Sequence, residues 1–236
     1  MYNYEQGEIT MFYSYCILFF IYSFLGWIME VSLTLITDKK FVNRGFLLGP
    51  CCPIYGCGCI LLNLLLHNYT NNVLVLFILT MFTCSLLEYI TSFLMEKIFK
   101  LRWWDYSQMR FNINGRICLE TMAPFSILGV LAIKYATPFF ITNINKLSEK
   151  AILIISIILT TLFIIDVIIS LIIVFKLKFV TKNTKKDSTY DIKKAIKKFI
   201  KNDKYVYERI IKAFPNLTKS LKEKALKLKN KPKINK

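Results

Sequence analysis

The sequence is poor in charged residues over long stretches that are rich in apolar ones. The segments 11–36, 73–95 and 151–175 each contain a single charged residue. A soluble domain keeps roughly a quarter of its residues charged, whereas a helix of about 20 apolar residues crosses a bilayer core of about 30 Å. The shortage of charge therefore excludes an ordinary soluble domain and predicts transmembrane helices.

The sequence also lacks the motifs of several enzyme classes. It has no GxxxxGK[ST] loop, so the chain cannot hydrolyse ATP by that route. It has one histidine, His67, and its seven cysteines form no CxxC pair, so we expect no cofactor, no bound metal and reduced thiols. No nucleophile or paired-carboxylate constellation stands out, and a protein that is not an enzyme is the favoured interpretation.

Five segments are long and apolar enough to be predicted as spans: 11–36, 46–66, 73–95, 117–141 and 151–175. The second is interrupted by Pro50 and Pro53, which a transmembrane helix tolerates when its neighbours satisfy the freed backbone groups. Five spans with the N-terminus outside place 29 basic residues in the cytoplasm and 3 outside. If 46–66 were a re-entrant loop, the basic residues of 37–45 and 97–116 would lie on opposite sides of the membrane, and the excess of basic residues inside would be smaller. We therefore predict an all-α polytopic helical bundle of about five spans, N-out and C-in, in the cell membrane.

The positive charge of the chain belongs to its C-terminal part. From residue 176 onward there are 21 basic and 5 acidic residues, whereas residues 1–175 are almost neutral. We divide the chain into a transmembrane domain, 1–180, and a basic cytoplasmic tail, 181–236. Apolar residues at helical spacing in the tail predict amphipathic helices lying on anionic lipid. Nucleic acid is a disfavoured partner because no nucleic-acid-binding motif accompanies the charge.

A few ionisable side chains lie inside the predicted spans, where each costs at least about 2.5–3.5 kcal/mol. They are Glu30, Glu88, Glu120 and Asp166. At about 1.5 Å per residue, all four fall in the cytoplasmic half of the membrane. Arg44 and Arg116 are predicted at the same face, where either could pair with a carboxylate.

This arrangement has two interpretations. In the first, a polar pocket open to the cytoplasm is lined by Glu30, Glu88, Glu120, Arg44 and Arg116 together with the polar aromatic residues Trp27, Tyr55, Trp104 and Tyr106. In the second, the glutamates and arginines form structural ion pairs that fix the order of the helices. For Asp166, a hydrogen bond that joins two helices is favoured over a binding role. The loop 97–116 is predicted to lie at the membrane interface through Trp103, Trp104, Tyr106 and Phe111.

Several strings of the sequence resemble one bacterial family. They are SFLGWIME at 23–30, FVNRGFLLGPCCPIYGCG at 41–58, LEY at 87–89, WWDYS at 103–107, FNINGRICLE at 111–120 and RIIKAFPNLTKS at 209–220. In these strings the chain resembles the integral-membrane ABC-transporter permeases of the CmpB type. The resemblance adds Asn43, Asp105 and Asn112 to the candidate substrate-binding residues.

The resemblance implies a permease subunit that moves a small solute and works with a separate ATPase subunit. In this interpretation Glu30, Glu88 and Glu120 are the charge-selective groups and would favour a cationic solute. Five spans would then need a homodimer or a second membrane subunit to enclose a path. Two alternatives stay open. One is a membrane-embedded enzyme that acts on a lipid or its head group, with a glutamate as general base and Arg44 or Arg116 holding a phosphate. The other is a non-catalytic membrane adaptor.

Overall fold

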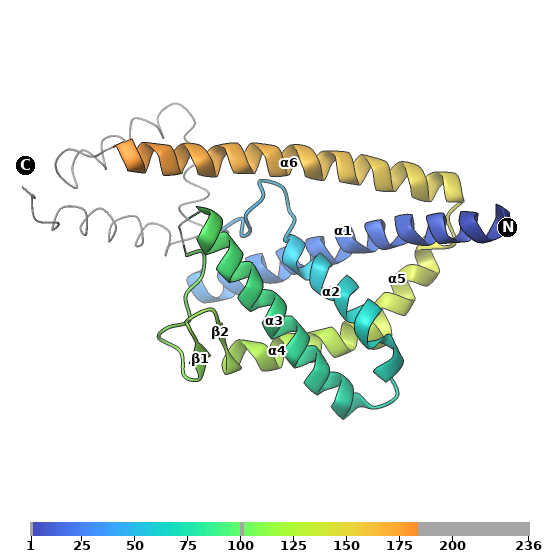
Figure 1. Cartoon of the computed structure of the whole chain (residues 1–236), viewed down its shortest axis with the longest axis horizontal. Coiled ribbons are helices and arrows are strands. Elements are labelled where there is room, and N and C mark those ends of the chain that lie inside the picture. The colour runs from blue at the N-terminus through green and yellow to red at the C-terminus, as the bar shows by residue number, and fades with distance from the viewer. Residues whose placement is uncertain (1, 100–101, 184–236) are drawn as a thin grey trace, which may run out of the picture.

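The computed structural model describes residues 2–99 and 102–183, and these are almost entirely helical (Figure 1). The elements, in chain order, are α1 (Tyr2–Asp38), α2 (Pro53–Leu66), η1 (His67–Tyr69), α3 (Val73–Phe99), β1 (Asn112–Ile113), β2 (Ile117–Cys118), α4 (Leu119–Leu131), the π-helical turn η2 (Ala132–Ala136), α5 (Thr137–Ile144) and α6 (Glu149–Asn183). The all-α membrane bundle predicted from the sequence is confirmed. The predicted amphipathic helices of the tail fall on residues 184–236, outside the described residues.

Among the described residues, four helical segments are long and apolar enough to cross a membrane: Ile9–Thr37, Val73–Phe99, Leu119–Ile144 and Glu149–Phe175. The predicted span 46–66 is helical only from Pro53, and the 14 residues of α2 rise by about 21 Å, which is less than a bilayer core. Residues 41–52 before it are not helical. The count of five spans and their N-out orientation stay predictions.

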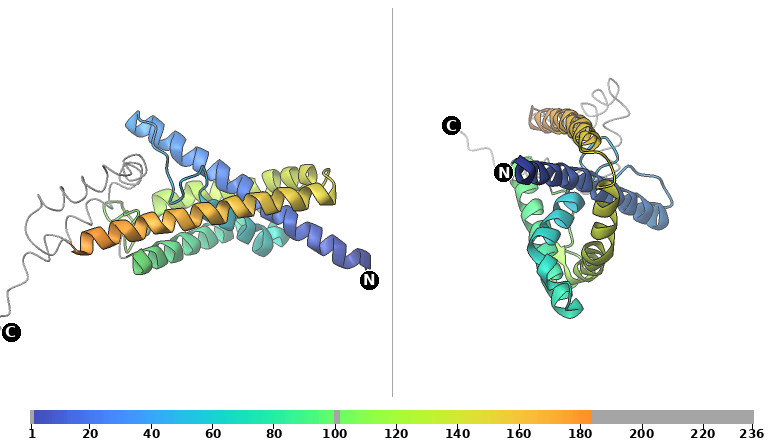
Figure 2. Two further views of the ribbon diagram at one scale, coloured as in Figure 1. Left: turned by 90° about the horizontal axis from the view of Figure 1, so that it is seen from above. Right: turned by 90° about the vertical axis from the view of Figure 1, so that its right-hand side faces the viewer.

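Successive helices reverse direction along the long axis of the molecule (Figure 1). α1, α3 and α6 run one way, whereas α2 and the α4–α5 pair run the other way, so the first and last described residues lie at opposite ends. α1 is the central helix, because it packs against α2, α5 and α6, and α3 packs against α2 and α4 (Figures 1 and 2).

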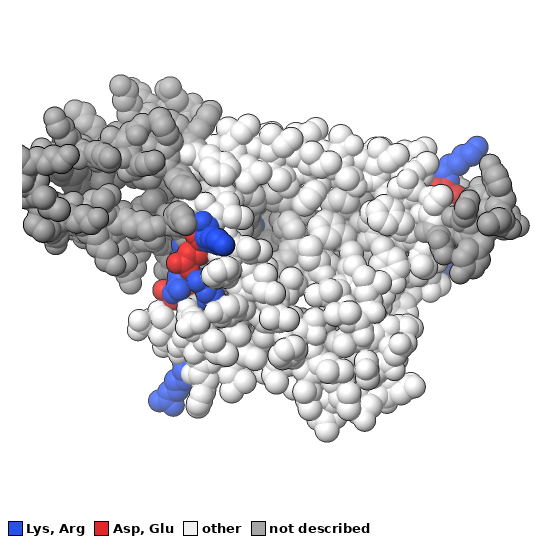
Figure 3. All heavy atoms as spheres, viewed as in Figure 1, with Lys and Arg blue, Asp and Glu red and all other residues white. Residues whose placement is uncertain are grey.

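The exterior of the bundle is apolar. Large apolar side chains are exposed along α1, α3 and α6, among them Phe12, Leu33, Leu74, Phe82, Ile154, Ile157, Ile158 and Leu162. Figure 3 shows basic and acidic side chains gathered at the two ends of one face, with an almost entirely uncharged surface between them. An apolar surface of this extent is suited to contact with lipid.

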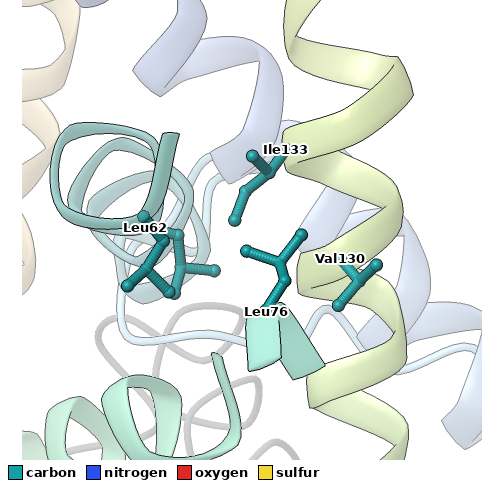
Figure 4. Packing of buried hydrophobic residues seen from close by; sticks show 5 residues of the cluster. Leu62, Leu76, Val130 and Ile133 are labelled. Atoms are coloured by element: carbon teal, nitrogen blue, oxygen red, sulfur yellow. The ribbon is translucent and has the colours of Figure 1, made fainter. Parts of the chain in front are cut away.

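The interior combines apolar packing with small polar side chains. Leu62, Leu76, Val130 and Ile133 form a buried cluster where α2, α3, α4 and η2 meet (Figure 4). Ser85 and Ser126 are buried nearby and donate to carbonyl groups one turn earlier in their own helices. Small side chains that return their hydroxyl to the helix allow close packing between helices without an unsatisfied polar group.

Candidate functional site

The close crossing of α1 and α2 forms the base of the candidate site. A Cβ atom on Gly26 would lie 2.6 Å from the Cβ of Tyr55 and closer still to its ring. On the other helix, a Cβ atom on Gly56 would meet the Phe19 carbonyl and the Ser23 hydroxyl. Only glycine fits at these two positions, and the missing side chains let Tyr55 lie directly against α1.

Tyr55 and Arg44 both contact the carboxylate of Glu30. The Tyr55 hydroxyl donates to Oε1 of Glu30 at 2.6 Å, and Nε of Arg44 lies 3.6 Å from Oε2. The Glu30 and Arg44 side chains are each about one third exposed. The ion pair predicted between a membrane carboxylate and Arg44 is therefore present, and the Tyr55 hydroxyl donates a hydrogen bond to the other oxygen of the Glu30 carboxylate.

The non-helical segment 41–52 places Arg44 beside Glu30. Nε1 of Trp27 donates to Oδ1 of Asn43 at 2.6 Å, and Nδ2 of Asn43 donates to the Leu48 carbonyl at 3.0 Å. On the other side, the amides of Leu48 and Gly49 both donate to the Asp166 carboxylate at 2.8 Å. Asp166 of α6 thus serves as a structural hydrogen-bond acceptor, but it joins α6 to the non-helical segment 41–52 and not to a second helix as the sequence predicted.

Glu88 of α3 is the second membrane carboxylate near Glu30. Its carboxylate accepts a hydrogen bond from the Tyr106 hydroxyl and is close enough to Glu30 for the two charges to interact. Burial and the neighbouring Glu88 carboxylate raise the pKa of Tyr106, so its hydroxyl stays protonated and available as a donor. Among the residues that the structure describes, no lysine or arginine forms an ion pair with Glu88.

Arg116 belongs to a separate cluster at the end of α3. Its Nη2 lies 3.0 Å from Oε2 of Glu96, and its guanidinium lies over the rings of Tyr89 and Phe93. The guanidinium of Arg102 contacts the same Glu96 oxygen at 3.4 Å. Arg116 therefore pairs with Glu96, which the sequence did not single out, rather than with Glu30, Glu88 or Glu120.

The remaining loop residues fix the turn between α3 and α4. Asp105 accepts from Nη1 of Arg102 at 3.0 Å and from the Ser107 amide at 3.1 Å. Partial burial acts to raise the pKa of Asp105, but the hydrogen bonds from Ser107 and the Arg102 charge outweigh it and lower the pKa overall. Oδ1 of Asn112 accepts from the Gly115 amide at 2.9 Å. Asp105 and Asn112 thus make local contacts within the loop.

Glu120 lies apart from both clusters. It is exposed in the first turn of α4, where a negative charge interacts favourably with the helix dipole. Within residues 2–99 and 102–183 it forms neither a hydrogen bond nor an ion pair. Hydrogen bonds and one ion pair thus join Trp27 to Asn43, and Tyr55 and Arg44 to Glu30. Glu88 and Tyr106 interact with each other and lie within range of the Glu30 charge. Glu120, Arg116, Asp105 and Asn112 lie outside both groups.

The cysteines add no metal-binding geometry to this region. All seven are free thiols. The described part of the chain contains no group of three or more His, Cys, Asp or Glu side chains arranged to hold a metal ion.

The fold and the polar residues between its helices define a polytopic helical membrane protein. Residues 17–171, well over half of the chain, match the family described as "Putative ABC-transporter type IV", of the CmpB type. The chain belongs to this family, as the resemblance of its motifs implied. The searches for curated relatives and for similar solved structures found no match.

Proposed function

We propose that this chain is the membrane subunit of an ABC-type transporter and that Glu30 and Glu88 bind a small cationic solute at a polar site open to the cytoplasmic side. The observation that carries the proposal is the unequal pairing of two glutamates within the helical bundle. Glu30 forms an ion pair with Arg44, whereas Glu88 forms none with the described residues. A cationic solute would supply a partner for Glu88.

The position of the carboxylates supports this interpretation. Glu30 is 8 residues before the end of α1 and Glu88 is 11 residues before the end of α3, so each lies roughly 12–17 Å along its helix from that end. A carboxylate at that depth is costly unless it is paired or serves a solute. The Tyr55 hydroxyl contacts Glu30, and the Tyr55 ring packs edge-to-face against Phe125 at a centroid distance of 6.0 Å, so aromatic side chains adjoin the carboxylate.

The transport role requires partners. Because the chain has no nucleotide-binding loop, energy from ATP would come from a separate ATPase subunit. Four long helices and the short α2 are few to enclose a path, so a second copy of the chain or another membrane subunit would complete it. We also propose that the membrane domain is surrounded by the lipid bilayer and that the basic tail contacts anionic lipids.

Affinity purification from the native membrane in mild detergent tests the assembly. We expect an ATPase subunit to co-purify with the tagged chain and to be lost when the membrane domain is unfolded by heat. Recovery of the folded chain without any ATPase, alone or as a dimer, would count against the permease and favour the adaptor or the lipid-modifying enzyme.

A further inference from the structure

The hairpin between α3 and α4 presents an apolar tip. Phe111 is 78% exposed, Ile113 53% and Met109 41%. These three residues lie within a stretch of five, and the exposed Arg110 lies between Met109 and Phe111 in the sequence. A soluble surface rarely concentrates large apolar side chains in this way without a binding role.

The tip is held in a strained conformation. Phe111 and Asn114 have φ of +50° and +53° without being glycine, a backbone state that costs on the order of 1–3 kcal/mol. Surrounding contacts maintain it. Nδ2 of Asn112 donates to the Met109 carbonyl at 2.7 Å, Nη2 of Arg102 donates to the Asn114 carbonyl at 3.1 Å, and the Tyr106 amide donates to the Gly115 carbonyl at 2.8 Å. Strain that is maintained in this manner is a reason to assign a role to the exposed ring of Phe111.

The other aromatic residues of the loop point into the protein. Trp103 is buried against the rings of Phe46 and Phe99, at centroid distances of 5.5 and 5.7 Å. Nε1 of Trp104 donates to the Arg116 carbonyl at 3.0 Å, and Tyr106 contacts Glu88. Trp103 is thus buried within the protein, and the interfacial position of the loop stays a prediction. Among the aromatic residues predicted for that interface, Phe111 alone is strongly exposed.

The position and charge of the hairpin indicate what covers the tip. β2 ends at Cys118 and α4, which begins the third span-length segment, starts at Leu119, so the hairpin lies at the end of the apolar bundle (Figure 1). Residues 97–116 contain five basic residues and one acidic residue, Asp105, which is paired with Arg102. Apolar side chains beside an excess of positive charge suit the boundary of an anionic lipid leaflet.

We propose that Met109, Phe111 and Ile113 insert into the anionic lipid leaflet next to the cytoplasmic end of the bundle, with Arg110 contacting lipid phosphates. The rigid hairpin then fixes the end of α3, and with it the Glu96–Arg116 ion pair, against the membrane surface. This inference does not depend on the transport role, because it concerns the surface of the loop and not the carboxylates.

Tryptophan quenching in vesicles tests this proposal. The full chain with Phe111→Trp is reconstituted into phosphatidylcholine, with and without phosphatidylglycerol, and the emission of the wild type, which has three tryptophans, is subtracted. We expect the added emission to be quenched by phosphatidylcholine brominated near the head group and protected from aqueous iodide, more strongly when phosphatidylglycerol is present. Ile113→Trp serves as a second reporter if the first variant does not fold.

The Arg110→Gln substitution in the Phe111→Trp chain is the matched control. It should remove the effect of phosphatidylglycerol and retain quenching by the brominated lipid. Quenching of the added tryptophan by iodide and not by brominated lipid would place the tip in water, where a protein partner would be its occupant, and would overturn the proposal. Lipid quenching that is the same with and without phosphatidylglycerol would overturn the anionic preference.

Discussion

Replacing Gly26 with alanine should separate Tyr55 from Glu30. The new methyl carbon would lie 2.6 Å from the Cβ of Tyr55, whereas two carbon atoms are normally about 3.5–4.0 Å apart, so Tyr55 must move by about 1 Å or more. The Tyr55–Glu30 hydrogen bond is 2.6 Å long, and the same displacement stretches it beyond the limit of a hydrogen bond.

The expected loss of stability has three contributions. Overpacking at the helix crossing costs about 1–3 kcal/mol, and the lost hydrogen bond to a charged group costs about 1.5–3 kcal/mol. Alanine returns about 1 kcal/mol because it is a better helix former than glycine. The net loss is about 1.5–5 kcal/mol, which lowers the melting temperature by at least about 3 °C for a chain of this length.

Thermal unfolding of the purified protein in detergent, followed by circular dichroism, measures this loss. Gly58→Ala in α2 is the control, because the added Cβ would make only an ordinary 3.4 Å contact with the Leu87 side chain of α3. That variant should melt at the wild-type temperature or slightly above it. If Gly26→Ala is as stable as Gly58→Ala, the close contact between α1 and Tyr55 is absent and the reasoning is refuted.

Two further predictions concern the segments around the site. Asp166→Ala removes the acceptor of two backbone amides and should cost about 1.5–3 kcal/mol of stability for each hydrogen bond lost. Thr161→Ala is the control, because the Thr161 hydroxyl donates to the Ile157 carbonyl of its own helix, and this variant should melt nearly as the wild type does. Equal melting temperatures for the two variants would contradict the structure. For Asp105, the folded state has a pKa below the ordinary value of 3.8, so its stabilising contribution is present above that pH and is lost as the pH falls through the folded pKa. Below about pH 4 the melting temperature of the wild type should therefore fall more steeply than that of Asp105→Asn, and parallel curves would show that Asp105 contributes nothing.

The long helices could be predicted from the sequence because nearly every residue in them is apolar. α1, α3 and α6 each contain a predicted span, and the α4–α5 pair covers the fourth. The predicted span 46–66 is not helical along its whole length, because contacts from distant parts of the chain hold the residues before Pro53 in a non-helical conformation. Asp166 is more than 100 residues away from Leu48 and Gly49, and no local pattern indicates that pairing.

The partners of the two arginines were also only partly predictable from the sequence. Arg44 reaches Glu30, one of the carboxylates proposed for it, whereas Arg116 reaches Glu96. A signal for the second pair was present in the sequence. Tyr89, Ser92 and Glu96 follow one another at spacings of three and four residues, so they share one face of α3, and all three contact Arg116. The partner of a cation on another element still depends on how the helices pack.

The central claim is that Glu30 and Glu88 form a cation-binding site, and thermal-shift titration of the purified protein tests it most directly. Sodium, potassium, methylammonium and choline are compared at increasing concentration with the wild type, Glu88→Gln and Glu120→Gln. A cation at 100 times its dissociation constant stabilises the folded state by about 2.7 kcal/mol, a shift of about 5 °C or more. We predict such a shift for at least one cation in the wild type and in Glu120→Gln, and none in Glu88→Gln. No shift with any cation, or an undiminished shift in Glu88→Gln, would contradict the claim.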